Sequence, residues 1–136
     1  MKRSWLKKGT KQLKKTPLEK RGKPNLQKKA WSVFSKWIRN RDKICVTCGS
    51  RKDGQAGHFY HGVLDFDEVN INQQCSHCNK WKHGNLAIYS NYLLNKHGLK
   101  VFKDLEKRHY LALRGEYRTD EDYLEIIRKY EIPSNN

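Results

Sequence analysis

The chain has 136 residues and a formal net charge of +15, from 29 Lys and Arg against 14 Asp and Glu. This length suits one modest domain with appendages. So large a positive excess is most simply explained by a nucleic-acid partner, although a solubilising basic surface would give the same sum. No apolar run approaches the roughly 18–20 residues of a membrane-spanning helix, and no apolar stretch of a signal peptide follows the charged start. We therefore expect a cytoplasmic protein.

Residues 1–24 form a basic leader with ten Lys or Arg against one acid, Glu19. Pro17, Gly22 and Pro24 interrupt any long helix in it. Such a block buries too little apolar surface to order itself, so we predict a flexible arm that binds phosphates; a plain disordered tail is the alternative. The DNA contacts predicted in this arm are Lys2, Arg3, Lys7, Lys8, Lys11, Lys14 and Lys15.

Four later stretches have the spacing of amphipathic helices. The first begins at Asn25 as its N-cap, the second follows Gly84 and ends near Gly98, and the third runs from about 99 to 113. The fourth begins at Thr119, whose hydroxyl can cap a helix. The apolar stripe of the first helix is expected to be core: Leu26, Ala30, Val33, Phe34, Trp37 and Ile38. The second helix carries Leu86, Ile88, Tyr89, Tyr92, Leu93 and Leu94, and the fourth carries Tyr123, Leu124, Ile126, Ile127 and Tyr130. The apolar faces of the helices at 99–131 could form a dimer contact or pack on the core of their own chain.

The segment between the first two helices is irregular, with short extended stretches at 55–60 and 69–72. The fold class predicted is therefore α+β, mainly helical, with a small two-stranded centre.

Two Cys-x-x-Cys pairs, separated by 26 residues, predict a zinc site. Two thiolates two residues apart can reach one ion, and two such pairs complete a closed tetrahedral site. A closed site leaves no open position, so this zinc is expected to be structural. The alternatives are two disulfides, which a reducing compartment disfavours, and a redox pair, which the duplication disfavours. The ligands predicted are Cys45, Cys48, Cys75 and Cys78.

Residues between and just after these pairs suit phosphodiester hydrolysis, which needs an activated water and a Lewis acid. His58 lies in a predicted strand and is a suitable general base. Asn79 offers a carbonyl oxygen suited to Mg²⁺ or Mn²⁺. If Asn79 opens a helix, His83 shares its face four residues later and could bind the same ion.

Each of these residues also has a structural interpretation. His58 could be a structural histidine, Asn79 a helix cap, and His83 a surface group or an anion contact. Phosphate contacts are also predicted for His61, Lys80 and Lys82.

The order of these motifs is similar to that of the NinG (Rap) family of lambdoid phage recombination endonucleases. The matching segments are Cys45–Cys48, Ala56–Tyr60, Leu64–Asn70, Gln74–Asn79 and Gly84–Leu86, and the resemblance covers roughly residues 28–131. The arrangement also resembles phage endonuclease VII, a His-Me finger (HNH-like) resolvase with two Cys-x-x-Cys pairs. The resemblance implies a small ββα-metal core flanked by helices.

The resemblance also implies roles for single residues. His58 becomes the general base and Asn79 a ligand of the catalytic Mg²⁺ or Mn²⁺. One departure is Gly57, which stands where such enzymes usually carry an acid as second metal ligand. Waters and phosphate oxygens could complete the site, or His83 or a hairpin carboxylate (Asp65, Asp67 or Glu68) could replace that acid.

On this resemblance we divide the chain into a basic arm (1–24), a zinc-braced nuclease core (25–98) and a C-terminal helical extension of the same domain (99–136). The implied substrate is branched DNA such as Holliday junctions or D-loops, met in a bacterial host cytoplasm. A homodimer that pairs two active sites across a junction is a further expectation. The alternatives are a non-catalytic zinc-stabilised DNA-binding protein and an RNA-binding zinc protein, neither of which needs His58 together with Asn79.

Overall fold

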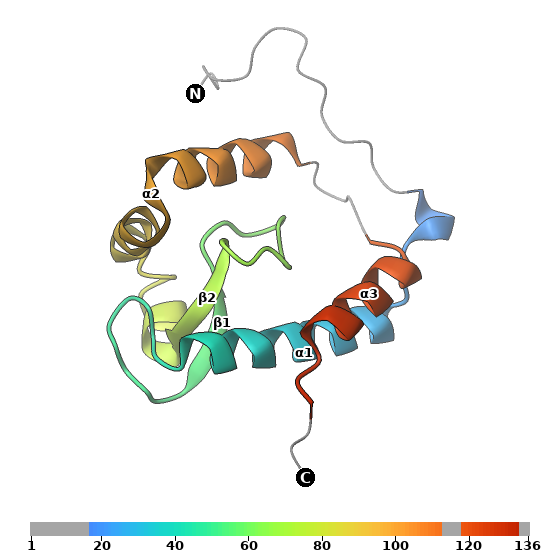
Figure 1. Cartoon of the computed structure of the whole chain (residues 1–136), viewed down its shortest axis with the longest axis horizontal. Coiled ribbons are helices and arrows are strands. Elements are labelled where there is room, and N and C mark those ends of the chain that lie inside the picture. Colours follow the sequence, from blue (N-terminus) through green and yellow to red (C-terminus); the bar gives the residue numbers. More distant parts are fainter. Residues whose placement is uncertain (1–16, 113–117, 134–136) are drawn as a thin grey trace, which may run out of the picture.

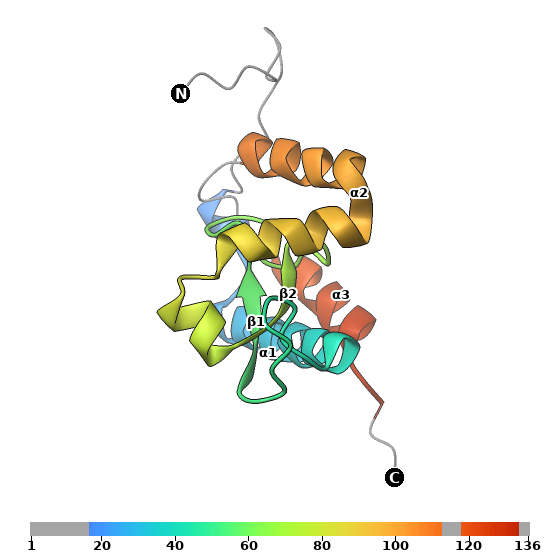
Figure 2. The ribbon, with the colours of Figure 1, turned by 90° about the vertical axis from the view of Figure 1, so that its left-hand side faces the viewer.

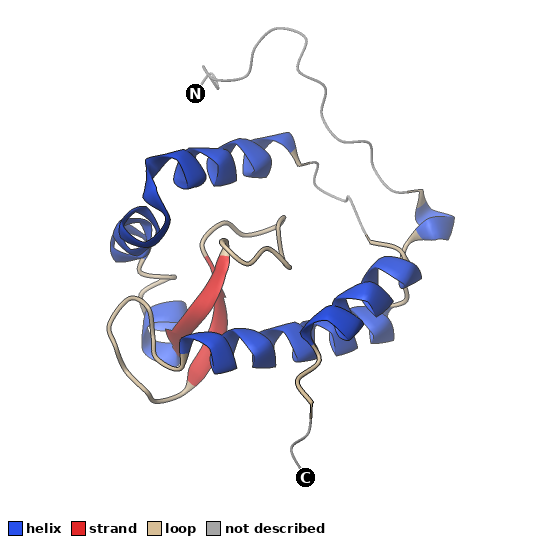
Figure 3. Ribbon diagram, in the orientation of Figure 1, coloured by secondary structure: helices blue, strands red, loops and turns tan. Residues whose placement is uncertain are grey.

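The computed structural model describes residues 17–112 and 118–133. In chain order these form η1 (Leu18–Lys20), α1 (Pro24–Asp42), β1 (Gly54–His58), β2 (Ile71–Cys75), η2 (His77–Trp81), α2 (Leu86–Leu111) and α3 (Asp120–Tyr130) (Figures 1 and 3). The expected mainly helical α+β fold with a two-stranded sheet is confirmed. The arm contacts predicted from Lys2 to Lys15 lie outside the described residues. Within the described ranges, no helix combines the length and apolarity needed to cross a bilayer.

Helix α1 begins earlier than expected. Asn25 is not its N-cap, because the cap residue is Lys23 and Pro24 takes the first helical position. Proline suits that position, since its missing N–H would have no partner in the first turn and its φ is already helical. The helix ends where Lys43 adopts a left-handed backbone (φ 65°), and this sharp stop turns the chain into the first cysteine pair.

The two strands pair antiparallel, with Gly54 opposite Cys75 and His58 opposite Ile71. Both strands differ from the stretches expected at 55–60 and 69–72. The reason is Asn70, whose side chain bonds Tyr60 N–H, Tyr60 C=O and Leu64 C=O and closes the long hairpin loop. Regular strand pairing therefore begins after Asn70, at Ile71, and continues to Cys75, the first residue of the second cysteine pair.

Helix α2 bends at Gly98, as the sequence predicts. Gly98 has a backbone (φ 84°, ψ 169°) that is accessible to glycine and costly for other residues. The two halves of α2 consequently fold back on each other beside the hairpin (Figure 2). Leu105 of the second half packs against Tyr89 and Leu93 of the first, so the bend creates a buried cluster.

The C-terminal helix α3 completes the core next to α1 (Figure 1). Its cap is the predicted one: Thr119 accepts from Asp122 N–H, and the Asp122 carboxylate accepts from Thr119 N–H. Tyr130 packs edge-on against Phe34, with ring centroids 4.8 Å apart. Both join Ile38 and Ile71 in one buried cluster that holds α1, α3 and β2 together.

We expect Phe34→Ala to lower the free energy of unfolding by about 3–5 kcal/mol, because it empties the centre of this cluster. Chemical denaturation followed by circular dichroism measures the change. Leu18→Ala is the matched control, since the Leu18 side chain is exposed and its truncation should leave stability nearly unchanged. Equal small effects in both variants would contradict the assignment of this core.

Candidate functional site

The four cysteines lie together, with all their Sγ atoms within 4.8 Å of one another. Cys48 Sγ and Cys75 Sγ are 3.6 Å apart and all four thiols are free. A tetrahedral zinc–thiolate site, with Zn–S bonds of about 2.3 Å, places its sulfurs about 3.8 Å apart. The backbone holds the two pairs in place, because Val46 N–H donates to the C=O of Gln73 in β2. The cluster could therefore hold a structural zinc.

The electrostatics of this cluster also suit a cation. Burial disfavours ionisation of Cys45, but hydrogen bonds with Thr47 and nearby backbone amides outweigh it and lower its pKa to about 6. At Cys48 a backbone hydrogen bond from Ser50 favours the thiolate, but burial and three neighbouring thiols prevail and raise its pKa to about 12. The Cys45 thiolate therefore forms readily, whereas ionisation of Cys48 is opposed, and a bound divalent cation would relieve that opposition.

His58 ends β1 and lies in a cluster of aromatic and polar side chains. Its ring stacks on Trp31 of α1 (centroids 5.2 Å, planes 17° apart) and on His61 (5.2 Å, 25°). Its Nε2 lies 3.2 Å from Asp65 Oδ1. The His58 hydrogen bond lowers the pKa of Asp65, with help from nearby positive charge and against the effect of burial. The pair therefore stabilises the fold above the unfolded carboxyl pKa of about 4 and ceases to do so as pH falls through the lower folded pKa.

His61 is exposed next to this pair. Burial lowers its pKa, and the charge of His58 lowers it further, while Asp65 opposes both. At neutral pH the His61 ring is therefore mainly uncharged. Its predicted contact with phosphate would then depend on hydrogen bonding rather than on charge.

Asn79 lies in η2 within a group of amide side chains that we call the amide cluster: Gln55, Gln74 and Asn79. Asn79 Nδ2 donates to Gln55 Oε1 at 2.9 Å, and Gln55 faces Gln74 across the sheet. Gln74 is fully buried and donates through Nε2 to Gly84 C=O at 2.7 Å. That bond fixes the orientation of the amide, so the other atom is the oxygen. Among the described residues, this buried oxygen has no hydrogen-bond partner.

The amide cluster also explains Gly57. A methyl group at residue 57 would overlap Gln74 Oε1, so a side chain at the position expected to carry an acid would require the Gln74 amide to move. Gln55 and Gln74 are members of the candidate site that were not predicted from the sequence. The alternation of side chains along a strand could have indicated Gln55, because it puts residues 55 and 57 on the same face of the sheet.

The general-base candidate and the metal-ligand candidate have different neighbours. Asn79 contacts Gln55, and Gln55 is three residues before His58, so their side chains leave opposite faces of β1. His58 faces α1 together with Ile71. The described contacts of His58 and Asn79 thus lie on opposite faces of the hairpin.

The expectation that Asn79 and His83 share a helix face is wrong. The helical turn η2 ends at Trp81, and His83 has a left-handed backbone (φ 50°) in the turn that follows. The reason is the tight return of the chain, in which Gly84 N–H donates to Cys78 C=O at 2.9 Å. His83 is exposed there, as are Lys80 and Lys82.

Two of the three hairpin carboxylates are engaged elsewhere. Asp67 forms an ion pair with Arg108 and accepts from two backbone amides of its own loop. Glu68 accepts from the Tyr130 hydroxyl at 2.7 Å. Asp65 is therefore the hairpin carboxylate that lies at His58.

Comparison with known proteins gives consistent matches. A family model described as "Bacteriophage Lambda NinG protein" matches residues 2–133. Protein ninG of Escherichia phage 933W is 37% identical over 90 residues, which cover 60% of this chain and 45% of that protein. Protein ninG of Salmonella phage P22 is 36% identical and that of Escherichia phage lambda 34% identical, each over 90 residues covering 60% of this chain and 44% of the relative. The chain thus spans less than half the length of these relatives. No solved structure matches it.

Proposed function

The chain belongs to the family of the bacteriophage lambda NinG protein, and from that premise we propose that it is a metal-dependent DNA endonuclease with a His-Me finger core. His58 is the proposed general base. Asn79 is a proposed ligand of the catalytic cation, and branched recombination intermediates are the proposed substrate class.

The observation that carries this proposal is the contact between His58 and Asp65. The 3.2 Å contact uses Nε2 of the ring, and among the described residues no hydrogen bond engages Nδ1. A carboxylate on one ring nitrogen fixes the tautomer, so that the other nitrogen carries the lone pair of a base. Stacking on Trp31 fixes the ring plane. This is the arrangement needed to take a proton from water as its oxygen bonds to phosphorus and the P–O bond to the leaving group breaks.

The amide cluster fits the proposed Mg²⁺ or Mn²⁺. Asn79 donates through its nitrogen, so its carbonyl oxygen is available, and Gln74 Oε1 is a buried oxygen without a partner among the described residues. Both are hard oxygen donors of the kind these ions prefer. When bound, the cation would act as a Lewis acid on the scissile phosphate. We propose that these amide oxygens take the part first predicted for His83.

DNA is the proposed partner because the formal net charge of the chain is +15 and because the exposed Lys80 and Lys82 follow the second cysteine pair. The second candidate function is a zinc-stabilised DNA-binding protein without catalysis. Gly57 favours it, because the amide cluster offers only neutral ligands where an acid would hold a cation more strongly. The two functions differ in whether DNA is cleaved. Only the nuclease predicts that the His58–Asp65 contact affects a cleavage rate.

We expect Asp65→Asn to slow DNA cleavage by about 10–100-fold, the range for losing a carboxylate that orients a functional histidine. Binding of DNA, measured by fluorescence anisotropy, should change little. Asp104→Asn is the matched control, because Asp104 belongs to an exposed ion pair on α2 and such pairs contribute little. If Asp65→Asn cleaves as fast as Asp104→Asn, the proposed role of the contact is wrong.

A further inference from the structure

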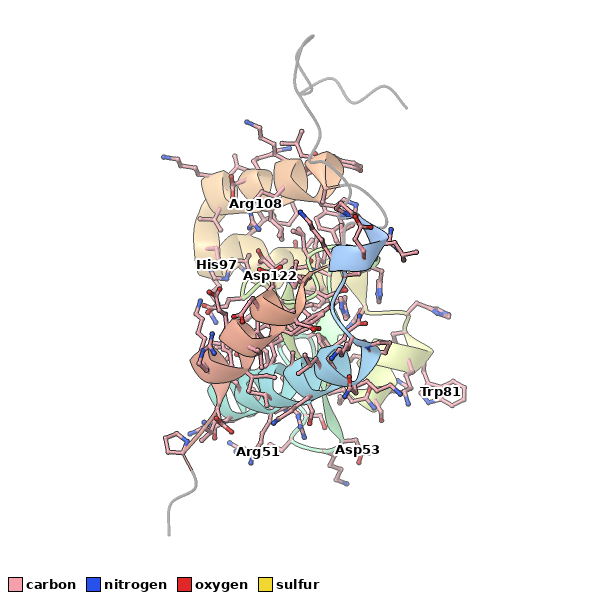
Figure 4. All side chains as sticks on the ribbon, turned by 90° about the vertical axis from the view of Figure 1, so that its right-hand side faces the viewer. Arg51, Asp53, Trp81, His97, Arg108 and Asp122 are labelled. Atoms are coloured by element: carbon pink, nitrogen blue, oxygen red, sulfur yellow. The ribbon has the colours of Figure 1, made fainter. Side chains whose placement is uncertain are left out.

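Trp81 is a large apolar side chain in water. Its exposed fraction is 77%, and Figure 4 shows it projecting away from the body of the protein. Trp31 and Trp37, in contrast, stack on neighbouring rings. Among the described residues, no ring-stacking or cation–π partner of Trp81 is found. An indole carries a large apolar face that gains from being covered.

The indole is carried by a hydrogen-bonded turn of the backbone. Trp81 ends η2, three residues after Cys78 of the proposed zinc site. The turn behind it is closed by hydrogen bonds from Lys82 N–H to His77 C=O (3.0 Å) and from Asn85 N–H to Lys82 C=O (2.9 Å). A backbone held this way leaves only the two side-chain torsions of Trp81 to be ordered when the ring binds a partner. The exposure of Trp81 is thus built into an anchored turn.

The residues around Trp81 are basic and therefore favour a negatively charged partner. Lys80, Lys82 and His83 are exposed on the same turn, and the sequence has no acidic residue between Glu68 and Asp104. The partner should therefore be anionic and should offer a flat apolar face. Nucleotides combine both features, an anionic phosphate and a flat base, and aromatic stacking platforms in basic grooves bind single strands. A base inside a duplex already stacks on both sides, so the available base is an unpaired one.

We propose that Trp81 stacks on an unpaired DNA base, with Lys80 and Lys82 on the flanking phosphates. This inference rests on the proposed function for its DNA partner and narrows the substrate to DNA with unpaired bases. The turn also carries Asn79 two residues earlier, so a base held by Trp81 would bring unpaired DNA to the amide cluster.

The test is the affinity of the whole 136-residue chain, loaded with zinc, for two fluorescein-labelled DNAs, without added Mg²⁺ or Mn²⁺. One is a single strand, and the other is the fully paired duplex of the same sequence. Trp81→Ala is compared with Trp81→Phe, which keeps an aromatic face, and with Leu99→Ala, which removes another exposed apolar side chain. Zinc content and thermal unfolding are measured for each variant.

We expect Trp81→Ala to raise the Kd for the single strand about tenfold, from the loss of one stacked base. Its Kd for the duplex should stay nearly unchanged. Trp81→Phe should keep most of the affinity, and Leu99→Ala should behave as the parent does. An equal loss on both DNAs, or no loss on either, would overturn the inference while leaving the proposed nuclease standing. A parent protein that binds neither DNA would overturn the inference and the proposed function together.

Discussion

His58→Ala is expected to slow metal-dependent DNA cleavage by about 10²–10⁴-fold, the usual worth of a general base. The variant should keep its zinc and its affinity for DNA, because His58 lies at the opposite end of the strand pair from Cys75 and the Lys and Arg residues available to phosphates are unaltered. Cleavage of a 5′-labelled DNA under single-turnover conditions gives the rate, and filter binding gives the affinity.

The matched control for this variant is His83→Ala. His83 lies exposed in a turn and outside the helical turn that carries Asn79, so its removal should leave the cleavage rate close to that of the parent. If His58→Ala loses cooperative unfolding, the ring serves as a packing partner of Trp31 rather than as a base. If His83→Ala abolishes cleavage with Asn79 intact, the amide cluster is not the cation site that we propose.

Cys78→Ser is expected to remove the zinc and with it the cooperative unfolding of the protein. Cys78 is fully buried, and a hydroxyl is a far weaker zinc ligand than a thiolate. Structural zinc in small domains contributes on the order of 10–16 kcal/mol of binding free energy, which is comparable to the whole stability of a domain of about 5–15 kcal/mol. The cluster joins the loop after α1 to the end of β2, so without the ion only backbone hydrogen bonds such as Val46 N–H to Gln73 C=O would hold the first cysteine pair on the hairpin.

Zinc per chain, measured by inductively coupled plasma mass spectrometry, and thermal unfolding test this expectation. Ser76→Ala is the matched control, because it alters the same cysteine pair and keeps all four thiols. A Cys78→Ser protein that unfolds cooperatively at the parent temperature would show that the cluster does not stabilise the fold. A parent protein that purifies without zinc, and does not gain stability when zinc is added, would contradict the zinc site itself.

Local chemistry explains which parts of the fold could be predicted from the sequence. The two Cys-x-x-Cys pairs, the bend at Gly98 and the cap at Thr119 each depend on a few residues close in the chain, and all three were predicted. The predicted start of α1, with Asn25 as its N-cap, is wrong, because the helix begins at Pro24. There two local signals competed, and the first-turn preference of proline prevailed.

Long-range contacts explain what could not be predicted. The packing of α3 on α1 depends on Phe34 meeting Tyr130, 96 positions later in the chain. The amide cluster depends on strand register, because Gln55 and Gln74 become neighbours only when Gly54 pairs with Cys75. The position of His83 depends on where η2 ends, and no residue pattern in that turn indicates it. The residue types at the candidate site could thus be predicted from the sequence. Which of these residues lie next to one another could not.

The most direct test of the central claim is cleavage of a labelled four-way junction beside its matched linear duplex. The zinc-loaded protein is assayed with Mg²⁺, with Mn²⁺ and with neither ion added. We predict cuts that require one of these cations, that disappear in His58→Ala, and that are faster on the junction than on the duplex. Binding of both DNAs without cleavage under any of these conditions would contradict the nuclease and favour the zinc-stabilised DNA-binding protein.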